Sequence, residues 1–188
     1  MGITSVKITL NESNKHIKGF ASVMLNNSML LRGIAITEHN SELNVILPKK
    51  KRKGREYFHP INRETREALK EKVLEAYHVV LESSEKDRVK WNQEETLSKI
   101  NSVSVHLIED DPLVKALITI VVNDEIAFNQ IRVIERNGEL ELVWPAKQKE
   151  RADVSYYFLD FFRPTNEEMK DKVTKAVLKE YNRVSCVK

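Results

Sequence analysis

The chain has 188 residues, of which 41% are hydrophobic and 31% charged, and its formal net charge is +3. This profile is typical of a globular protein and excludes disordered and fibrous classes. The single cysteine, Cys186, excludes an intramolecular disulfide framework and a cysteine-based zinc or iron–sulfur site, and it favours a reducing compartment. No apolar run approaches the roughly 20 residues of a membrane span, and no signal-peptide core is apparent, so we expect a cytoplasmic protein.

An internal repeat organises the chain. Residues Val6–Leu10 match Val103–Leu107, and the same spacing continues to Pro48 and Pro145. Beyond these prolines the second copy has seven more residues before the match resumes. The matched pairs include Asn26 with Asn123, Ile34 with Ile131, Phe58 with Phe162, Pro60 with Pro164, Asn62 with Asn166 and Tyr77 with Tyr181. The chain therefore consists of two copies of one unit.

The repeat defines the predicted domains. Residues 1–81 form the first copy, residues 82–98 a polar linker and residues 99–188 the second copy. The linker sequence is also compatible with a charged helix that extends the first copy. Trp91 is the large aromatic residue of this segment, and we expect it to pack on a neighbouring domain rather than bind a ligand, because large aromatic side chains bury well.

Each copy has the pattern of four strands followed by a helix. In the second copy, turn residues separate β-branched and aromatic runs at residues 103–107, 114–122, 126–134 and 139–144. Asn137 and Gly138 indicate a tight type I′ hairpin, because both tolerate positive φ. Asn40 and Ser41 are the weaker equivalent in the first copy.

A helix is predicted after the aromatic-X-Pro segment of each copy. Asn62 is the expected N-cap of the first helix, and Thr165 to Glu168 fit a capping box at the start of the second. Apolar residues at helical spacing form one stripe per helix, Leu69, Val73, Ala76, Tyr77 and Val80 in the first and Met169, Val173, Ala176, Val177 and Tyr181 in the second. We expect each stripe to pack on the sheet of its own copy.

The predicted fold is α+β, with two tandem units that each consist of an antiparallel β-meander and a C-terminal α-helix and that together form a pseudo-dimer. Four-stranded sheets this short leave exposed edges, so we expect the copies to pair edge to edge or face to face. A fused pair already covers the surfaces that a single-copy protein would bury by dimerising. We therefore expect a monomer in solution.

Positive charge is concentrated in one loop. Residues 1–81 contain 14 Lys and Arg against 8 Asp and Glu, whereas residues 99–188 contain 14 against 15. Six of the basic residues of the first copy lie together: Lys49, Lys50, Lys51, Arg52, Lys53 and Arg55. Like charges this close repel one another, and bound phosphates relieve that repulsion and release counterions, so the loop predicts a polyanionic partner. A solvated hairpin tip is the alternative. Arg52 and Arg55 are the expected base contacts, because a guanidinium group binds bidentately.

Both copies resemble the SpoVG (stage V sporulation protein G, septation regulator) family of small bacterial proteins. The shared features are a strand that ends in proline (Val45–Pro48), a basic loop (Lys49–Arg55), an aromatic-X-Pro-Ile segment (Tyr57–Ile61) and a helix that ends in Val-Leu-x-x-Tyr (Val73–Tyr77). The resemblance implies a homodimeric sheet-and-helix domain that binds DNA, in some cases RNA, and regulates gene expression. It also implies that the basic loop makes the nucleic-acid contacts. Family members usually carry one copy, whereas this chain carries two.

Other residues extend the predicted nucleic-acid surface. Arg63 and Arg66 lie one turn apart at the start of the first helix, where backbone N–H groups favour an anion, although acidic neighbours make an ordinary solvated face equally compatible. Tyr57 and Phe58 are candidates for stacking on unpaired bases, and we expect at least one of them to face the core instead. The candidates in the second copy are Lys147, Lys149, Arg151 and Arg163.

The sequence shows no catalytic or cofactor motif. It lacks a Gly-rich phosphate loop, and its histidines have no Ser or Cys partner at a recognisable spacing. The acidic residues Glu109–Asp111 precede Pro112 and favour a structural turn over a metal site. We therefore expect a non-enzymatic nucleic-acid-binding regulator of gene expression without a cofactor or metal. The alternative is a protein–protein interaction scaffold whose basic loop binds an acidic partner protein.

Overall fold

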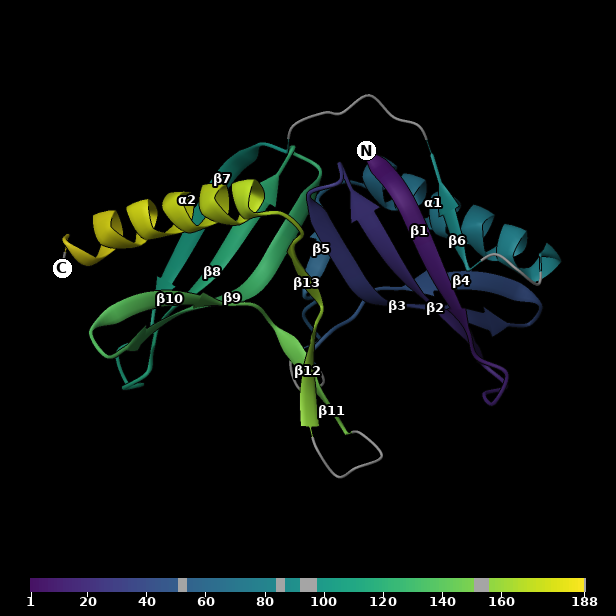
Figure 1. Cartoon of the computed structure of the whole chain (residues 1–188), viewed down its shortest axis with the longest axis horizontal. Coiled ribbons are helices and arrows are strands. Elements are labelled where there is room, and N and C mark those ends of the chain that lie inside the picture. The colour runs from purple at the N-terminus through teal and green to yellow at the C-terminus, as the bar shows by residue number, and fades with distance from the viewer. Residues whose placement is uncertain (51–53, 84–86, 92–97, 151–155, 188) are drawn as a thin grey trace.

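The computed structural model describes residues 1–50, 54–83, 87–91, 98–150 and 156–187, with only the backbone for residues 149, 150 and 156. Its elements in chain order are β1 (Ile3–Leu10), β2 (Ile17–Leu25), β3 (Met29–His39), β4 (Glu42–Ile46), β5 (Phe58–Pro60), α1 (Arg63–Glu82), β6 (Arg88–Lys90), β7 (Ile100–Leu107), β8 (Val114–Val122), β9 (Ile126–Arg136), β10 (Glu139–Val143), β11 (Ala146–Glu150), β12 (Tyr156–Asp160), β13 (Phe162–Pro164) and α2 (Glu167–Ser185) (Figure 1). Within the described part of the chain, neither helix is long and apolar enough to cross a membrane.

Each copy builds one antiparallel sheet with one helix on it (Figure 1). Strands β1 to β4 follow one another as a meander in the first copy, and β7 to β10 do the same in the second. Helix α1 packs on β1 and β4, and α2 packs on β7, so each helix covers the sheet of its own copy. This confirms the predicted α+β fold of two meander-and-helix units.

Strand alternation decides which face of each sheet the helix covers. On β9, Ile131 and Val133 are buried, whereas Arg132 between them is exposed. On β8, Ile118 and Ile120 are buried on either side of the half-buried Thr119. Because side chains alternate between faces with a period of two, the buried residues point toward α2. The other face, which carries Arg132 and Thr119, is called the open face below.

The two copies exchange short strands across their boundary. Strand β5 of the first copy pairs antiparallel with β9 of the second, and β13 of the second copy pairs with β3 of the first. Backbone hydrogen bonds continue both pairings, from Ile61 N to Glu125 O and from Thr165 N to Ser28 O, each 2.9 Å long. The copies thus associate through their sheet edges in a form that the sequence did not predict. Each copy covers an edge that the other would expose.

The exchange joins both copies in one apolar core. The ring centroid of Phe162 lies 6.3 Å from that of Phe58 and 4.9 Å from that of Phe128, and all three residues are fully buried. The preceding residues, Tyr57 and Phe161, stack with their ring centroids 4.0 Å apart. Buried residues of both sheets and both helices belong to the same cluster. Equivalent residues of the copies therefore meet at the boundary, as in a homodimer.

Asparagine caps both helices. The Asn62 side chain accepts a hydrogen bond from Thr65 N at 2.8 Å, which confirms the predicted cap of α1. The cap of α2 is the equivalent residue, Asn166, which accepts from Met169 N at 2.8 Å. The predicted capping box that starts at Thr165 is therefore wrong. The Thr165 hydroxyl instead donates to the backbone carbonyl of Asn27 in the first copy at 2.9 Å, and this bond helps to hold β13 beside β3.

The predicted apolar stripes face the sheets. All five residues of the α1 stripe are buried, whereas in α2 Met169, Val173 and Val177 are buried and Ala176 and Tyr181 are partly buried. The hairpin prediction is also confirmed, because φ is positive at both central residues of each turn. Its values are 49° and 65° at Asn40 and Ser41, and 53° and 80° at Asn137 and Gly138.

The described part of the segment between the copies adds an edge strand to the first sheet. Strand β6 pairs antiparallel with β1. Trp91 follows it and packs on α1, where the indole N–H donates to Glu75 at 3.1 Å and the Lys72 ammonium lies 4.7 Å from the ring centroid. At residues 88–90 the segment is thus a strand, not the charged helix of the alternative prediction. Trp91 packs on protein, as expected, but its partner is the preceding copy.

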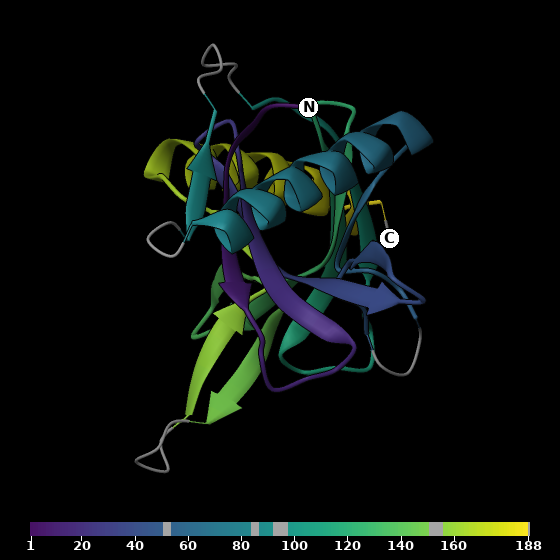
Figure 2. The ribbon, with the colours of Figure 1, turned by 90° about the vertical axis from the view of Figure 1, so that its right-hand side faces the viewer.

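The extra residues of the second copy form a projecting hairpin. Strands β11 and β12 pair antiparallel as a separate two-stranded sheet. The hairpin stands away from the body, below the junction of the two sheets (Figures 1 and 2). At the equivalent place the first copy has a single bridge between Lys49 and Glu56. The two strands of this segment were not predicted from the sequence.

Candidate nucleic-acid interface

The basic loop of the first copy meets the open face of the second copy's sheet through its described residues. Its base is closed by the bridge between Lys49 and Glu56 and by a hydrogen bond from Lys50 N to Arg55 O at 2.9 Å. Strand β5 follows the loop and joins the second sheet beside β9, so the exchange places the loop there. Lys49, Lys50 and Arg55 are exposed. The other three predicted loop residues, Lys51, Arg52 and Lys53, lie outside the described residues.

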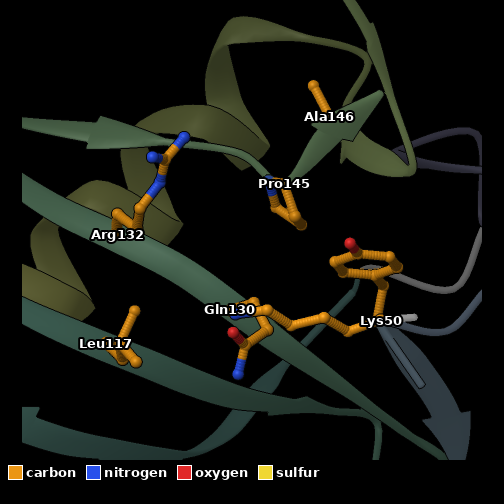
Figure 3. A pocket seen from close by; sticks show the side chains of 7 residues that line it. Lys50, Leu117, Gln130, Arg132, Pro145 and Ala146 are labelled. Carbon is orange, nitrogen blue, oxygen red and sulfur yellow. The ribbon is translucent and has the colours of Figure 1, made fainter. Parts of the chain in front are cut away.

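The first of two hollows on this surface combines cations from both copies. Lys50 and Tyr57 of the first copy form one wall, and Leu117, Gln130 and Arg132 of the second form the other, around about 260 Å³. Figure 3 shows Lys50 reaching from its loop toward Gln130, with Arg132 farther along the same strand. We call this the Lys50 hollow. Arg132 was not among the predicted site residues, because one exposed arginine in a strand has no distinguishing sequence pattern.

The second hollow, about 520 Å³, adjoins the first at Gln130, which lines both. Lys49, Arg55 and the acidic Glu56 line it together with Thr119, Asn129 and Gln130 of the second copy's sheet. We call it the Arg55 hollow. Its polar wall offers amide and hydroxyl groups that can donate and accept hydrogen bonds. The two hollows together are the composite surface, whose basic residues are Lys49, Lys50, Arg55 and Arg132.

Asn129 fixes the loop to the second copy. Its side-chain amide donates to the Glu56 carbonyl at 3.0 Å and to Nδ1 of His59 at 3.0 Å, so the neutral His59 ring carries its proton on Nε2. Its backbone N–H donates to the Tyr57 carbonyl at 2.7 Å. One residue of the second copy therefore contacts three residues of the segment that follows the basic loop, Glu56, Tyr57 and His59.

The two predicted helix-start arginines differ in their surroundings. Arg66 makes a two-pronged ion pair with the carboxylate of Glu56, with N–O distances of 3.0 and 3.4 Å. This contact neutralises the charge of Arg66 and also that of the acidic residue next to Arg55. Arg63 is exposed at the first position of α1. The ion pair thus cancels the negative charge of Glu56 next to the composite surface, and it makes Arg66 less available to an anion.

The sheet of the first copy has a different group of residues at the place equivalent to Asn129. Arg32 occupies that position on β3, and its backbone N–H donates to the Phe161 carbonyl at 2.7 Å. Arg163 and Asp160 lie close enough to influence it. Burial and the charge of Arg163 lower the pKa of Arg32, and burial raises the pKa of Asp160 although both arginines oppose that rise. Arg163, a predicted site residue, therefore belongs to an arginine pair that the sequence analysis missed. A charge inside the apolar run of β3 was the available signal.

The remaining predicted residues divide into exposed and undescribed ones. Lys147 is exposed on β11. Lys149 lies on the same strand, but its side chain is outside the described residues, as is the whole of Arg151. Phe58 is buried in the core, as expected for at least one of the two aromatic residues, and one face of the Tyr57 ring is covered by Phe161.

The acidic segment before β8 forms a turn. The carboxylate of Asp111 accepts hydrogen bonds from Leu113 N and Val114 N, both at 2.9 Å. These two bonds lower the pKa of Asp111. In the described ranges of the chain, no three His, Cys, Asp or Glu side chains are grouped so that they would hold a metal ion. The turn interpretation of this segment is thus confirmed for Asp111.

Comparison with known proteins finds the same repeat. A model of the SpoVG family matches residues 1–79 and again residues 98–183. The chain is 33% identical over 78 residues to "Putative septation protein SpoVG" of Archaeoglobus fulgidus, which covers 40% of this chain and 92% of that relative. It is 36% identical over 87 residues to the protein of the same name from Bdellovibrio bacteriovorus (44% and 79%), and 29% identical over 89 residues to that of Staphylococcus aureus (47% and 85%). Each of these relatives corresponds to about one copy.

Proposed function

Because the chain belongs to the SpoVG family and carries its domain twice, we propose that it binds DNA or RNA through the composite surface. In this role it acts as a non-enzymatic regulator of gene expression in the cytoplasm. The first copy contributes the basic loop. The second copy contributes the sheet on which that loop lies, together with one further cation.

The convergence of Lys50 and Arg132 on one hollow carries this proposal. The two residues come from different copies, and no carboxylate lines the Lys50 hollow in the part of the chain that the structure describes. Cations gathered without a counter-charge repel one another, and a phosphate placed between them relieves that repulsion. The hollow is thus better suited to an anionic strand than to water alone.

The composite surface also offers groups for two kinds of contact. Lysines bind phosphates as point charges and position the strand, whereas arginine and amide side chains present paired donors or acceptors to base edges. Lys49 and Lys50 fit the first role. Arg55, Arg132 and Gln130 fit the second. If three to four phosphates are neutralised on a duplex, log K falls with log salt at a slope between about −2.7 and −3.6.

The test compares two charge-matched double variants. Lys49→Gln with Lys50→Gln removes two cations from the composite surface, and Lys175→Gln with Lys179→Gln removes two exposed cations from α2, on the other side of its sheet. Fluorescence anisotropy is measured with labelled duplex DNA, single-stranded DNA and RNA at several salt concentrations. We expect the loop variant to lose affinity and to reduce the salt slope by about 2, because two phosphate contacts disappear. The α2 variant should match the wild type.

Two outcomes contradict the proposal. Equal losses in the two variants would show that net charge alone drives binding. No binding of the wild-type protein to any of the three probes at low salt would favour an acidic protein as the partner of the basic loop.

A further inference from the structure

The projecting hairpin exposes an aromatic ring to solvent. Phe158 on β12 is 70% exposed, more than any other aromatic residue that the structure describes, and its ring takes part in none of the ring contacts found there. Its cross-strand neighbour is the polar Gln148. An apolar side chain this exposed gains nothing from the core of its own chain, so it contributes to stability only by contact with something else.

The same face of the hairpin leads to the arginine pair. Phe158 and Asp160 are two residues apart on β12, so their side chains lie on the same face of the strand. Asp160 interacts electrostatically with Arg32 and Arg163. Neither arginine forms an ion pair with any residue of the described ranges, and Arg163 is exposed. The exposed ring is thus two residues along β12 from a carboxylate near both guanidinium groups, and the backbone of Arg32 is held to Phe161 directly after that strand.

A flat apolar ring on a strand that ends near two cations matches the chemistry of a nucleotide. A base has a π-face that stacks on an aromatic side chain, and its phosphate pairs with a guanidinium group. In a duplex the bases stack on each other, so the ring has access only to an unpaired base. We propose that Phe158 stacks on a base of single-stranded DNA or RNA whose phosphates contact Arg32 and Arg163. This inference rests on the proposed function and adds the preference for unpaired bases.

The place of the hairpin supports this occupant. It projects from the body below the junction of the two sheets, and the composite surface lies at the same junction, where β5 and its loop meet β9 (Figures 1 and 2). A strand held by Lys50 and Arg132 has the hairpin beside it, because Pro145 and Ala146, which begin the hairpin, also line the Lys50 hollow. One strand is therefore able to contact both regions.

The experiment measures binding to a labelled single-stranded DNA and to the duplex of the same sequence. The variants are Phe158→Ala, Phe158→Leu and Phe158→Trp, and the control is Leu81→Ala, which removes another exposed apolar side chain at the end of α1. We expect Phe158→Ala and Phe158→Leu to weaken single-strand binding roughly 5- to 100-fold, because stacking on one base is lost, and to leave duplex binding unchanged. Phe158→Trp should retain the affinity. A 2-aminopurine base in the strand should be quenched by wild type and not by Phe158→Ala.

The outcomes separate this inference from the proposed function. If wild type binds single strands and Phe158→Ala or Phe158→Leu binds equally well, the stacking role is wrong while the proposed function stands. If Phe158→Ala weakens duplex binding as much as single-strand binding, the ring does not select unpaired bases. If wild type sediments as a dimer, at twice 21.8 kDa, and Phe158→Ala sediments as a monomer of 21.8 kDa, the ring packs against a second copy of the chain. That result also overturns the inference. Failure of wild type to bind any nucleic acid rejects both proposals.

Discussion

The loop of the first copy and the hairpin of the second occupy equivalent places and present different chemistry. Beside the loop stands Asn129, an uncharged donor, whereas the equivalent residue beside the hairpin is Arg32. Both keep the same backbone hydrogen bond of 2.7 Å, to the carbonyl of Tyr57 in one case and of Phe161 in the other. The two copies therefore share the backbone arrangement at the boundary and differ in the side chains that it carries.

The equivalent acidic residues of the two places, Glu56 and Asp160, also differ in their surroundings. Glu56 beside the loop pairs with Arg66, so its charge is neutralised locally. Asp160 is the equivalent residue beside the hairpin, and burial raises its pKa instead. The same backbone position thus supports an ion pair on one side and a partly desolvated carboxylate on the other.

The largest expected effect comes from the residues that join the copies. Phe162→Ala should lower the free energy of unfolding by about 3 to 5 kcal/mol, because it leaves a cavity in the shared core. Phe58→Ala should cost less, since Phe162 contacts the rings of Phe58, Phe128 and Trp144, whereas Phe58 contacts only that of Phe162 among the described ring pairs. Urea denaturation measures both, and it should show one transition. Two transitions would mean that the copies unfold separately and that the core is not continuous.

A smaller effect should follow when the two open faces are made alike. Arg132 occupies the position of Ala35 in the first copy, so Arg132→Ala gives the second face the residue of the first. We expect roughly tenfold weaker nucleic-acid binding, because one charge-assisted contact is lost, and a salt slope smaller by about 1. The converse change, Ala35→Arg, is the control and should not weaken binding. Anisotropy titrations measure the affinity of both variants. Unchanged affinity of Arg132→Ala would show that Arg132 of the second copy does not contribute to binding.

The smallest effect concerns pH and the two equivalent carboxylates. Because burial raises the pKa of Asp160 above its ordinary value of 3.8, the folded chain holds this proton more tightly than the unfolded chain. The contribution of Asp160 to stability is therefore greatest at a pH below 3.8, and it is lost as the pH rises through the raised pKa of the folded chain. Asp160→Asn should match wild type in acid and be slightly more stable near pH 7.

The matched change in the first copy should have the opposite sign. Glu56→Gln removes the ion pair with Arg66, so it should lower stability near pH 7 by at most about 1 kcal/mol, as is usual for exposed pairs. Thermal denaturation at several pH values measures both variants. A loss of stability in Asp160→Asn near pH 7 would show that its contact with the arginines outweighs its desolvation.

Local sequence patterns predicted most of the fold within each copy. The strands of the second copy, the stripe from Leu69 to Val80 and the turn at Asn137 and Gly138 all follow from periodicity or from residues that tolerate positive φ. The cap of α2 was misplaced by one residue, because Thr165 and Asn166 both have side chains suited to capping. Only the repeat itself, through the equivalent Asn62, distinguishes between them.

The association of the copies was not predictable in the same way. Strand β5 has three residues, Phe58 to Pro60, and a segment this short has no periodicity that identifies its partner strand. The same limit applies to the site. Arg132 and Arg32 are single charges within strands, and they acquire a role only when the exchange places the loop and the hairpin beside them. The basic loop was recognisable because its density of charge is a property of the sequence alone.

The strand exchange has a consequence for how a polymer would lie on this protein. A homodimer of identical subunits looks the same after half a turn, so a strand that crosses it meets the same groups from either end. Here the loop side and the hairpin side differ, and the exchanged strands hold them in a fixed order. In the proposed binding mode, a polynucleotide that spans both sides would therefore have two inequivalent orientations, 5′-to-3′ and 3′-to-5′, which are equivalent on a symmetric homodimer.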